Sequence, residues 1–153
     1  MSITDRNNNL YIRKIILFIS ISIESFENIG YNKIMAIQIF GTNKNFDCKK
    51  AQMWFKERRI QFQFIDLKEK EMSRGEFDSV VQSISKTAGS RQDALEQMID
   101  KSSKDYSSIA YLDESDIEEK LFENQNLLKQ PIVRNGKTLA TVGMATKIWE
   151  TWK

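Results

Sequence analysis

The residue best suited to chemistry is Cys48, the single cysteine of the 153-residue chain. A thiolate is a strong nucleophile, and it is favoured at a helix N-terminus or beside a lysine. Cys48 opens a helical pattern and is followed by Lys49 and Lys50, so the sequence provides both conditions. Asp47 opposes a thiolate, however. Two interpretations stay open: a reactive one-cysteine nucleophile and an inert, packed cysteine.

The rest of the composition excludes several kinds of site. The chain has no histidine, which excludes Ser-His-Asp and Cys-His catalysis and any His-ligated metal. One cysteine forms neither an intramolecular disulfide nor a multi-thiolate metal site, so we expect no bound metal. A lone thiol is typical of a cytoplasmic protein. A net charge of +2 without a basic stripe argues against direct binding of nucleic acid.

The N-terminal part differs from the rest. An apolar run, Ile15–Ile23, follows Arg13 and Lys14 and is interrupted by serines. It is too short to span a bilayer, so we expect no membrane insertion. Three readings remain: an extension that precedes a natural start at Met35, an export signal, or an additional strand. We predict an extension over residues 1–34 and one domain over 35–153.

The first half of that domain reads as a βαβ unit. Ala36–Phe40 is a short β-rich segment that ends at Gly41, and a helical pattern runs over Cys48–Arg59 with Asp47 as its expected N-cap. Phe62, Phe64 and Ile65 make a second short strand, which ends at Asp66. A strand, helix and strand in so few residues predict a parallel pair.

Helices and a hairpin follow. Ser73 and Glu76 have the spacing of a capping box, Ser90 opens another helix, and Ser115 begins a third. Pro131 then leads into a strand. Asn135-Gly136 predicts a type I′ hairpin with a returning strand over Thr138–Val142, and a last helix carries Met144, Ile148, Trp149 and Trp152. The order predicts an α/β, thioredoxin-like fold with a helical insertion between the βαβ and ββα halves.

Several short segments of the chain resemble segments of the ArsC/Spx family of arsenate-reductase-like proteins, and they occur in the same order. They cover most of residues 36–152, and residues 1–34 lie outside them. The segments are Ile37–Gly41, Cys48–Ala51 with Trp54-Phe55, Ile65-Asp66, Ser73–Phe77, Leu127–Val133, Asn135–Lys137 and Val142-Gly143.

The resemblance implies a reactive cysteine in the loop before the first helix, often as the first residue of a CxxC motif. An ungapped alignment places Asn45 at that position and Cys48 at the second one. The arginine that precedes the family's cis-proline is replaced by Gln130, next to Pro131. These departures count against arsenate reduction and leave one-cysteine, glutaredoxin-like thiol chemistry at Cys48 as the expected activity.

In that hypothesis the chain is an oxidoreductase without a bound cofactor, acting on a small thiol or an oxyanion. Cys48 attacks, Lys49 and the helix N-terminus stabilise its thiolate, and Asn45, Gln130 and Pro131 line the pocket. Glutathione or a thioredoxin-type reductant would regenerate the thiol. The alternative is a non-enzymatic, Spx-like module that binds RNA polymerase or another protein. A degenerate paralogue with a structural role is the third reading, and a monomer is the expected state.

Overall fold

A computed structural model describes residues 12–15 and 37–152. Residues 12–15 form an exposed helical turn. Most of the apolar run up to Ile23 and the expected boundary between residues 34 and 35 fall outside these ranges, so both stay predictions. In the two described ranges, no helix combines the length and apolar character that crossing a membrane requires.

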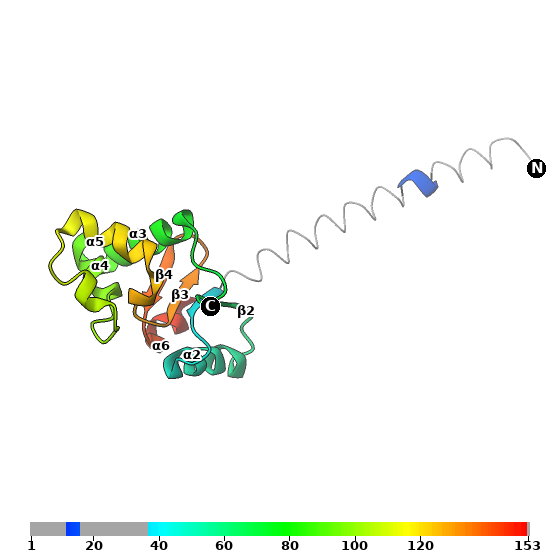
Figure 1. The fold of residues 1–153 in the computed structure, drawn as a ribbon. Coiled ribbons are helices and arrows are strands. Elements are labelled where there is room, and N and C mark those ends of the chain that lie inside the picture. The colour runs from blue at the N-terminus through cyan, green and yellow to red at the C-terminus, as the bar shows by residue number, and fades with distance from the viewer. Residues whose placement is uncertain (1–11, 16–36, 153) are drawn as a thin grey trace, which may run out of the picture. The chain divides into compact units, whose positions relative to one another are not determined.

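A four-stranded mixed sheet forms the centre of residues 37–152 (Figure 1). Its strands, in the order β2-β1-β3-β4, are β1 (Ile37–Gly41), β2 (Phe62–Asp66), β3 (Ile132–Asn135) and β4 (Leu139–Val142). β1 and β2 are parallel, whereas β3 is antiparallel to both β1 and β4. Helix α2 (Phe46–Glu57) makes the crossover between the parallel strands. The predicted thioredoxin-like arrangement is confirmed.

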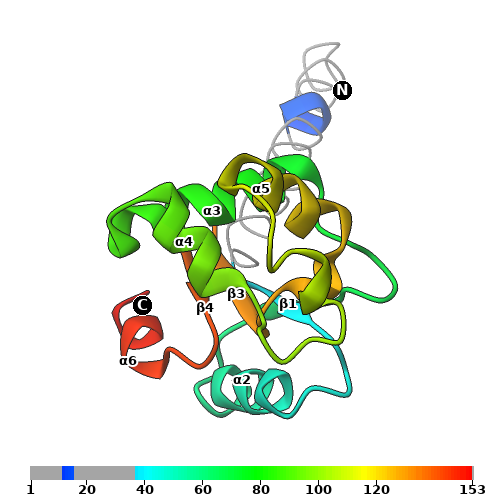
Figure 2. The same ribbon diagram turned by 60° about the vertical axis from the view of Figure 1, so that its left-hand side comes forward.

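The predicted helical insertion lies between β2 and β3 in the sequence, and its helices pack beside the sheet (Figure 2). Its elements are α3 (Arg74–Ala88), α4 (Arg91–Met98), η1 (Tyr106–Ser108), α5 (Glu114–Glu123) and η2 (Gln125–Leu127). After β4, the described chain ends with α6 (Thr146–Trp149) and η3 (Glu150–Trp152).

Among the three helices of the insertion, two begin where the sequence predicted. Ser73 and Glu76 form the complete capping box of α3, and the Ser90 side chain caps α4. The third helix was expected to begin at Ser115, but α5 begins at Glu114 with Asp113 at its N-cap. Asp113 has extended backbone angles, and its carbonyl accepts the first N–H groups of the helix. Both residue types suit this position, so local preference did not separate them.

The hairpin between β3 and β4 is present, but its turn differs from the predicted type I′. Asn135 stays in the strand and pairs with Leu139, which leaves the three residues 136–138 in the loop. Gly136 has φ of 61°, a conformation that glycine adopts without steric cost. The returning strand therefore begins at Leu139 instead of Thr138.

The sheet separates two apolar clusters. Phe40, Ile65 and Ile132 face the helical layer of α3, α4 and α5. Ile37, Ile39 and Val133 belong to the other cluster, which holds the buried side of α2 and α6. The buried aromatic residues of this second cluster are Trp54, Phe55 and Trp149, with ring centroids 4.9–5.4 Å apart. Each face of the sheet thus has its own core.

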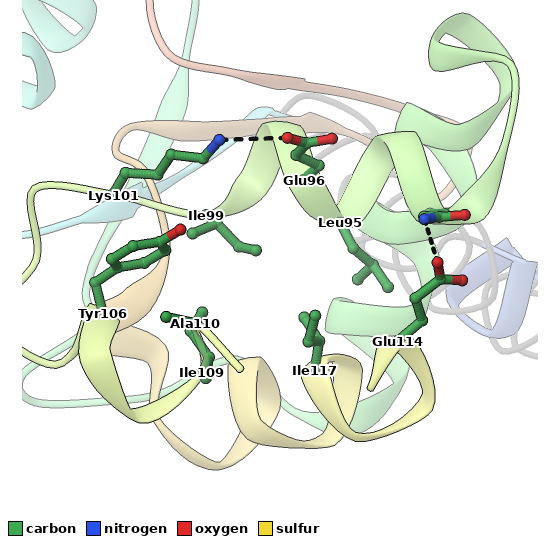
Figure 3. Close-up of a pocket in the computed structure, with 10 residues that line it drawn as sticks. Leu95, Glu96, Ile99, Lys101, Tyr106, Ile109, Ala110, Glu114 and Ile117 are labelled. Atoms are coloured by element: carbon green, nitrogen blue, oxygen red, sulfur yellow. Dashed lines mark hydrogen bonds and ion pairs between the residues drawn. The ribbon is translucent and has the colours of Figure 1, made fainter. Parts of the chain in front are cut away.

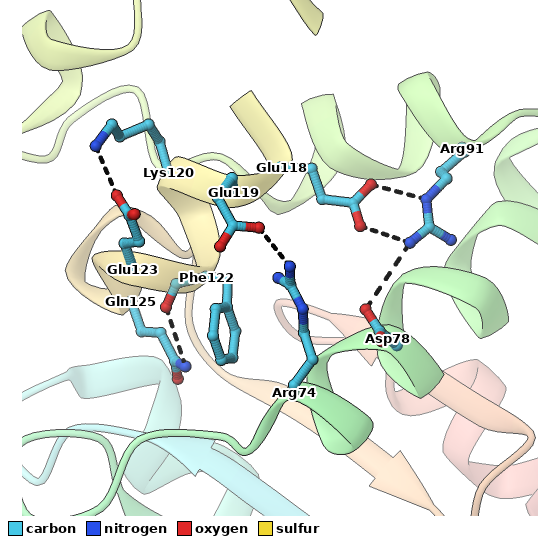
Figure 4. A network of polar contacts seen from close by, with 9 residues as sticks. All are labelled: Arg74, Asp78, Arg91, Glu118, Glu119, Lys120, Phe122, Glu123 and Gln125. Carbon is cyan, nitrogen blue, oxygen red and sulfur yellow. Dashed lines mark hydrogen bonds and ion pairs between the residues drawn. The ribbon is translucent and has the colours of Figure 1, made fainter. Parts of the chain in front are cut away.

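Ion pairs join α5 to the two other helices of its layer (Figure 4). Arg91 on α4 donates two hydrogen bonds to the Glu118 carboxylate, at 2.8 Å from Nε and 2.6 Å from Nη2. Arg74 on α3 donates to Glu119. The bidentate geometry at Glu118 fixes the angle of the arginine fork as well as its distance.

A buried glutamine makes a second connection, between η2 and the residue at position 72. Gln125 is 2% exposed. Its carboxamide oxygen accepts from the Met72 N–H at 2.8 Å, and its amide nitrogen donates to the Met72 carbonyl at 2.9 Å. One side chain of η2 thus satisfies both polar backbone groups of Met72, which precedes α3.

Candidate functional site

Of the five predicted site residues, Asn45 lies in the loop between β1 and α2, where it is the N-cap of the helix. The Asn45 Oδ1 atom accepts a hydrogen bond from the Cys48 N–H at 3.0 Å, and the backbone of Asn45 is extended. The prediction that Asp47 caps the helix was wrong, because Asp47 lies within the first turn. Its carboxylate still suits the positive end of the helix dipole.

Cys48 points into the protein and is fully buried. Its sulfur packs directly against Gly41, the last residue of β1. A Cβ atom added to Gly41 would lie 2.2 Å from the Cys48 Sγ atom. The space that holds the thiol exists because this strand ends in a residue without a side chain.

The side-chain oxygen of Gln130 is the point at which the donors of the loop converge. Gln130 Oε1 accepts from the Thr42 N–H at 2.8 Å and from the Thr42 hydroxyl at 3.0 Å. The Cys48 thiol donates to the same oxygen at 3.7 Å. The peptide bond between Gln130 and Pro131 is cis, as the family resemblance implied. The chain's own carboxamide therefore occupies the donors that an external oxygen would use.

The surroundings of Cys48 favour its protonated form. Burial is the main cause that raises the pKa of the Cys48 thiol to about 11, and the charges of Asp47 and Asp66 add to it. A hydrogen bond from the Thr42 backbone acts in the opposite direction without offsetting these effects. The hypothesis that the helix N-terminus and Lys49 stabilise a thiolate predicts the opposite shift.

The lysines that follow Cys48 lie on the solvent side of α2. Lys49 is exposed. Lys50 is 3.7 Å from the Asp47 carboxylate and lies over the ring of Phe46, with Nζ 4.5 Å from the centroid. Although these lysines are close to Cys48 in sequence, neither is among the groups that shift the pKa of its thiol.

Asp66 secures the outer side of the loop. Its Oδ2 atom accepts from the Asn43 side chain at 2.7 Å and from the Asn43 N–H at 3.3 Å, and its Oδ1 atom accepts from the Lys68 N–H at 3.0 Å. Asp66 reaches the loop because it pairs with Gly41 at the shared end of the parallel strands. The sequence carried this signal, since carboxyl ends of parallel strands meet at one edge.

The structure thus brings together four of the five predicted site residues, Asn45, Cys48, Gln130 and Pro131, and leaves Lys49 outside the cluster. Their catalytic and binding roles stay predictions. Sequence reasoning missed three further residues that shape the same loop, namely Gly41, Thr42 and Asp66. Within residues 12–15 and 37–152, no group of three His, Cys, Asp or Glu side chains is placed to hold a metal ion.

Neither a protein-family model nor a curated protein sequence matches the chain. Solved structures do match. A Bacteroides fragilis protein described as ArsC family related has a TM-score of 0.62 at 18% identity, covering 78% of this chain and 99% of its own. The chain has the fold of ArsC-related proteins.

Two further structures support that assignment. A protein of Streptococcus mutans described as a possible arsenate reductase has a TM-score of 0.60 at 13% identity, covering 76% of this chain and 98% of its own. The arsenate reductase from Vibrio cholerae has a TM-score of 0.58 at 18% identity, covering 71% of this chain and 89% of its own. The resemblance predicted from short segments is confirmed as a likeness of fold, and at these identities it does not extend to activity.

Proposed function

We propose that the chain is a non-enzymatic binding protein with an ArsC-like fold, in which the cysteine loop has a structural role. One observation carries this proposal: the Cys48 thiol is fully buried and donates to Gln130 inside a loop whose polar groups bind one another. A nucleophilic cysteine needs access to its substrate and a lowered pKa. Burial removes the first and raises the pKa instead.

The competing proposal is one-cysteine thiol chemistry at Cys48, with glutathione or a thioredoxin-type protein as the reductant. It requires an exposed thiolate at neutral pH. Asn45 would orient the incoming thiol in that mechanism, but its side-chain oxygen already accepts from the Cys48 N–H. The two proposals therefore make opposite predictions about the accessibility of one sulfur atom.

The pH dependence of Cys48 alkylation separates them, with the same protein unfolded in urea as the matched control. We expect slow labelling of the native protein at neutral pH, fast labelling of the unfolded chain, and no mixed disulfide with glutathione by mass spectrometry. Rapid native labelling with an apparent pKa below the unperturbed value of about 8.5, together with a glutathione adduct, would favour the enzyme instead.

The outer face of α2 is the surface that we propose for a partner. Phe46 is 69% exposed and Met53 is 59% exposed. They lie on one side of the helix with Lys50 between them, because residues at these spacings share a helical face. Lys49 and Lys56 are also exposed on α2. An apolar and basic face of this kind suits a protein surface with apolar and acidic groups.

RNA polymerase, the partner implied by the likeness to Spx proteins, is the first candidate, and a cytoplasmic location goes with it. Binding to purified polymerase is measured by biolayer interferometry with the wild type, Phe46→Ser and Met53→Ser. Tyr111→Ser is the control, since Tyr111 is 96% exposed and lies outside α2. We expect both α2 variants to weaken binding and the control to retain it. Absence of binding by the wild type would rule out polymerase as the partner.

A further inference from the structure

A pocket in the helical layer lies apart from both the cysteine loop and the proposed partner face of α2. It has a volume of about 220 Å³ and lies between α4, η1 and the start of α5 (Figure 3). Leu95, Ile99, Ile109 and Ile117 supply its aliphatic walls, and their side chains point toward the same space. Leu95 and Ile109 also belong to the core cluster beneath, so the floor is anchored in the packed interior.

Polar groups surround the opening of this pocket. At one side, Lys101 pairs with Glu96 at 3.3 Å, which neutralises both charges. At the other side, the Glu114 carboxylate accepts from the side-chain amide of Gln92. That amide is neutral, so the contact satisfies a hydrogen bond of Glu114 without compensating its charge. The rim as a whole therefore carries one excess negative charge.

We propose that this pocket binds a small organic amine with an apolar body. The body, one ring or a short alkyl chain, lies against the four aliphatic side chains, and the ammonium group donates to Glu114. A dry cavity of about 150 Å³ accommodates benzene, so a volume near 220 Å³ suits one ring with a short tail. A few polar groups around an apolar floor are the usual composition of a small-molecule site.

The test compares two ligands of matched shape and opposite charge. Phenethylamine and phenylpropionate are each titrated into the full-length, isotope-labelled protein, and amide shifts are followed by NMR. We expect saturable shifts of α4 and α5 resonances with phenethylamine in the millimolar range. Phenylpropionate should bind about tenfold more weakly, because its carboxylate meets the Glu114 charge. No saturable shift with the amine, or equal binding of the two ligands, would overturn the proposal.

Two variants locate the site. Ala110 lines the opening and is exposed, so Ala110→Trp is expected to fill it and abolish the shifts. Tyr111→Trp is the matched control at the adjacent, exposed position and should bind as the wild type does. Glu114→Gln should weaken the amine about fivefold and reduce the preference over the carboxylate.

The variants also keep the proposal testable if one of them is unstable. Circular dichroism establishes whether Ala110→Trp is folded. If Ala110→Trp is unfolded, the Glu114→Gln variant tests the site instead, because Glu114 is exposed and its replacement should leave the fold intact. Unchanged binding in a folded Ala110→Trp, or an unchanged preference for the amine in Glu114→Gln, would show that the amine binds elsewhere or that Glu114 does not select it.

Discussion

The contact between Gly41 and Cys48 can be tested by a double-mutant cycle. In Gly41→Ala the new methyl group would lie 2.2 Å from the Cys48 sulfur. Ordinary contacts between heavy atoms are about 3.5–4.0 Å, so the buried sulfur has to move by more than about 1 Å. Such overpacking typically costs about 1–3 kcal/mol.

The backbone effect of the same substitution is smaller and has the opposite sign. Gly41 lies outside the left-handed region, where alanine would be strained. Replacing glycine by alanine at a compatible position therefore stabilises by about 0.4–1 kcal/mol through the unfolded state. We expect Gly41→Ala to lower the free energy of unfolding by about 1–2 kcal/mol.

The second arm of the cycle removes the sulfur. Cys48→Ala loses one buried heavy atom and leaves a small void, which should cost about 1–2 kcal/mol. In the double variant, the methyl group introduced by Gly41→Ala enters the space that the sulfur has left. Its next contacts are ordinary ones, the Gln130 Oε1 atom at 3.4 Å and the Cβ atom of residue 48 at 3.5 Å. The double variant should therefore be at least as stable as Cys48→Ala alone.

The assay is urea unfolding followed by tryptophan fluorescence, with the slope m compared among the four proteins to test two-state behaviour. Trp54 and Trp149 are buried next to the core side of α2 and report on this region. The expected coupling energy is about 1–3 kcal/mol in favour of the double variant. Additivity within about 0.5 kcal/mol would refute the view that the sulfur and the glycine share one space.

Three further predictions concern other contacts. Gln125→Leu should lower the free energy of unfolding by about 2–4 kcal/mol in urea, because it orphans both backbone groups of Met72; a loss below about 1 kcal/mol would contradict this. The hydrogen bonds from Arg91 lower the pKa of Glu118, so their stabilisation is present above the unfolded pKa and is lost as pH falls through the folded one. The destabilisation by Arg91→Leu in thermal melts should accordingly shrink below about pH 4, and a constant difference would count against the ion pair. Asn45→Ala should cost about 1 kcal/mol in urea unfolding through loss of the α2 cap, whereas Asn45→Asp keeps the acceptor and should remain near the wild type; equal losses would exclude a capping role.

Local sequence was sufficient for most of the fold. The β1, α2 and β2 segments each had a clear pattern of apolar residues, and Gly41 and Asp66 marked the ends of the two strands. The capping box of Ser73 and Glu76 lies within one helical turn, so nothing distant changes it. In the hairpin, the presence of a turn was local information, but its loop length depended on Asn135 pairing with Leu139 across the sheet.

The start of α2 was harder to predict. Asn45 and Asp47 are both residues that cap helices well. Which of the two caps α2 depends on the residue at which the loop ends and the helix begins. Thr42 of that loop donates a hydrogen bond to Gln130, which lies 88 residues further along the chain. Sequence neighbours alone do not contain this constraint.

The environment of Cys48 could not be read from its neighbours either. Lys49 and Lys50 adjoin it in sequence, but successive residues of a helix are rotated by about 100°, which sends these side chains to solvent while Cys48 faces the sheet. Its burial depends on Gly41 and its hydrogen bond on Gln130, 82 residues away. The thiolate hypothesis predicts a lowered pKa for Cys48, which is the reverse of the shift that burial produces.

The separation of the two cores by the sheet has a consequence for how such a chain diverges. Substitutions on opposite faces share few partners, so their effects on stability should add, as they do for distant sites. The layer of α3, α4 and α5 can therefore accumulate changes, including a new pocket, without compensating changes around α2. Residues on one face of the sheet can therefore change under selection while the residues on the other face continue to hold the fold.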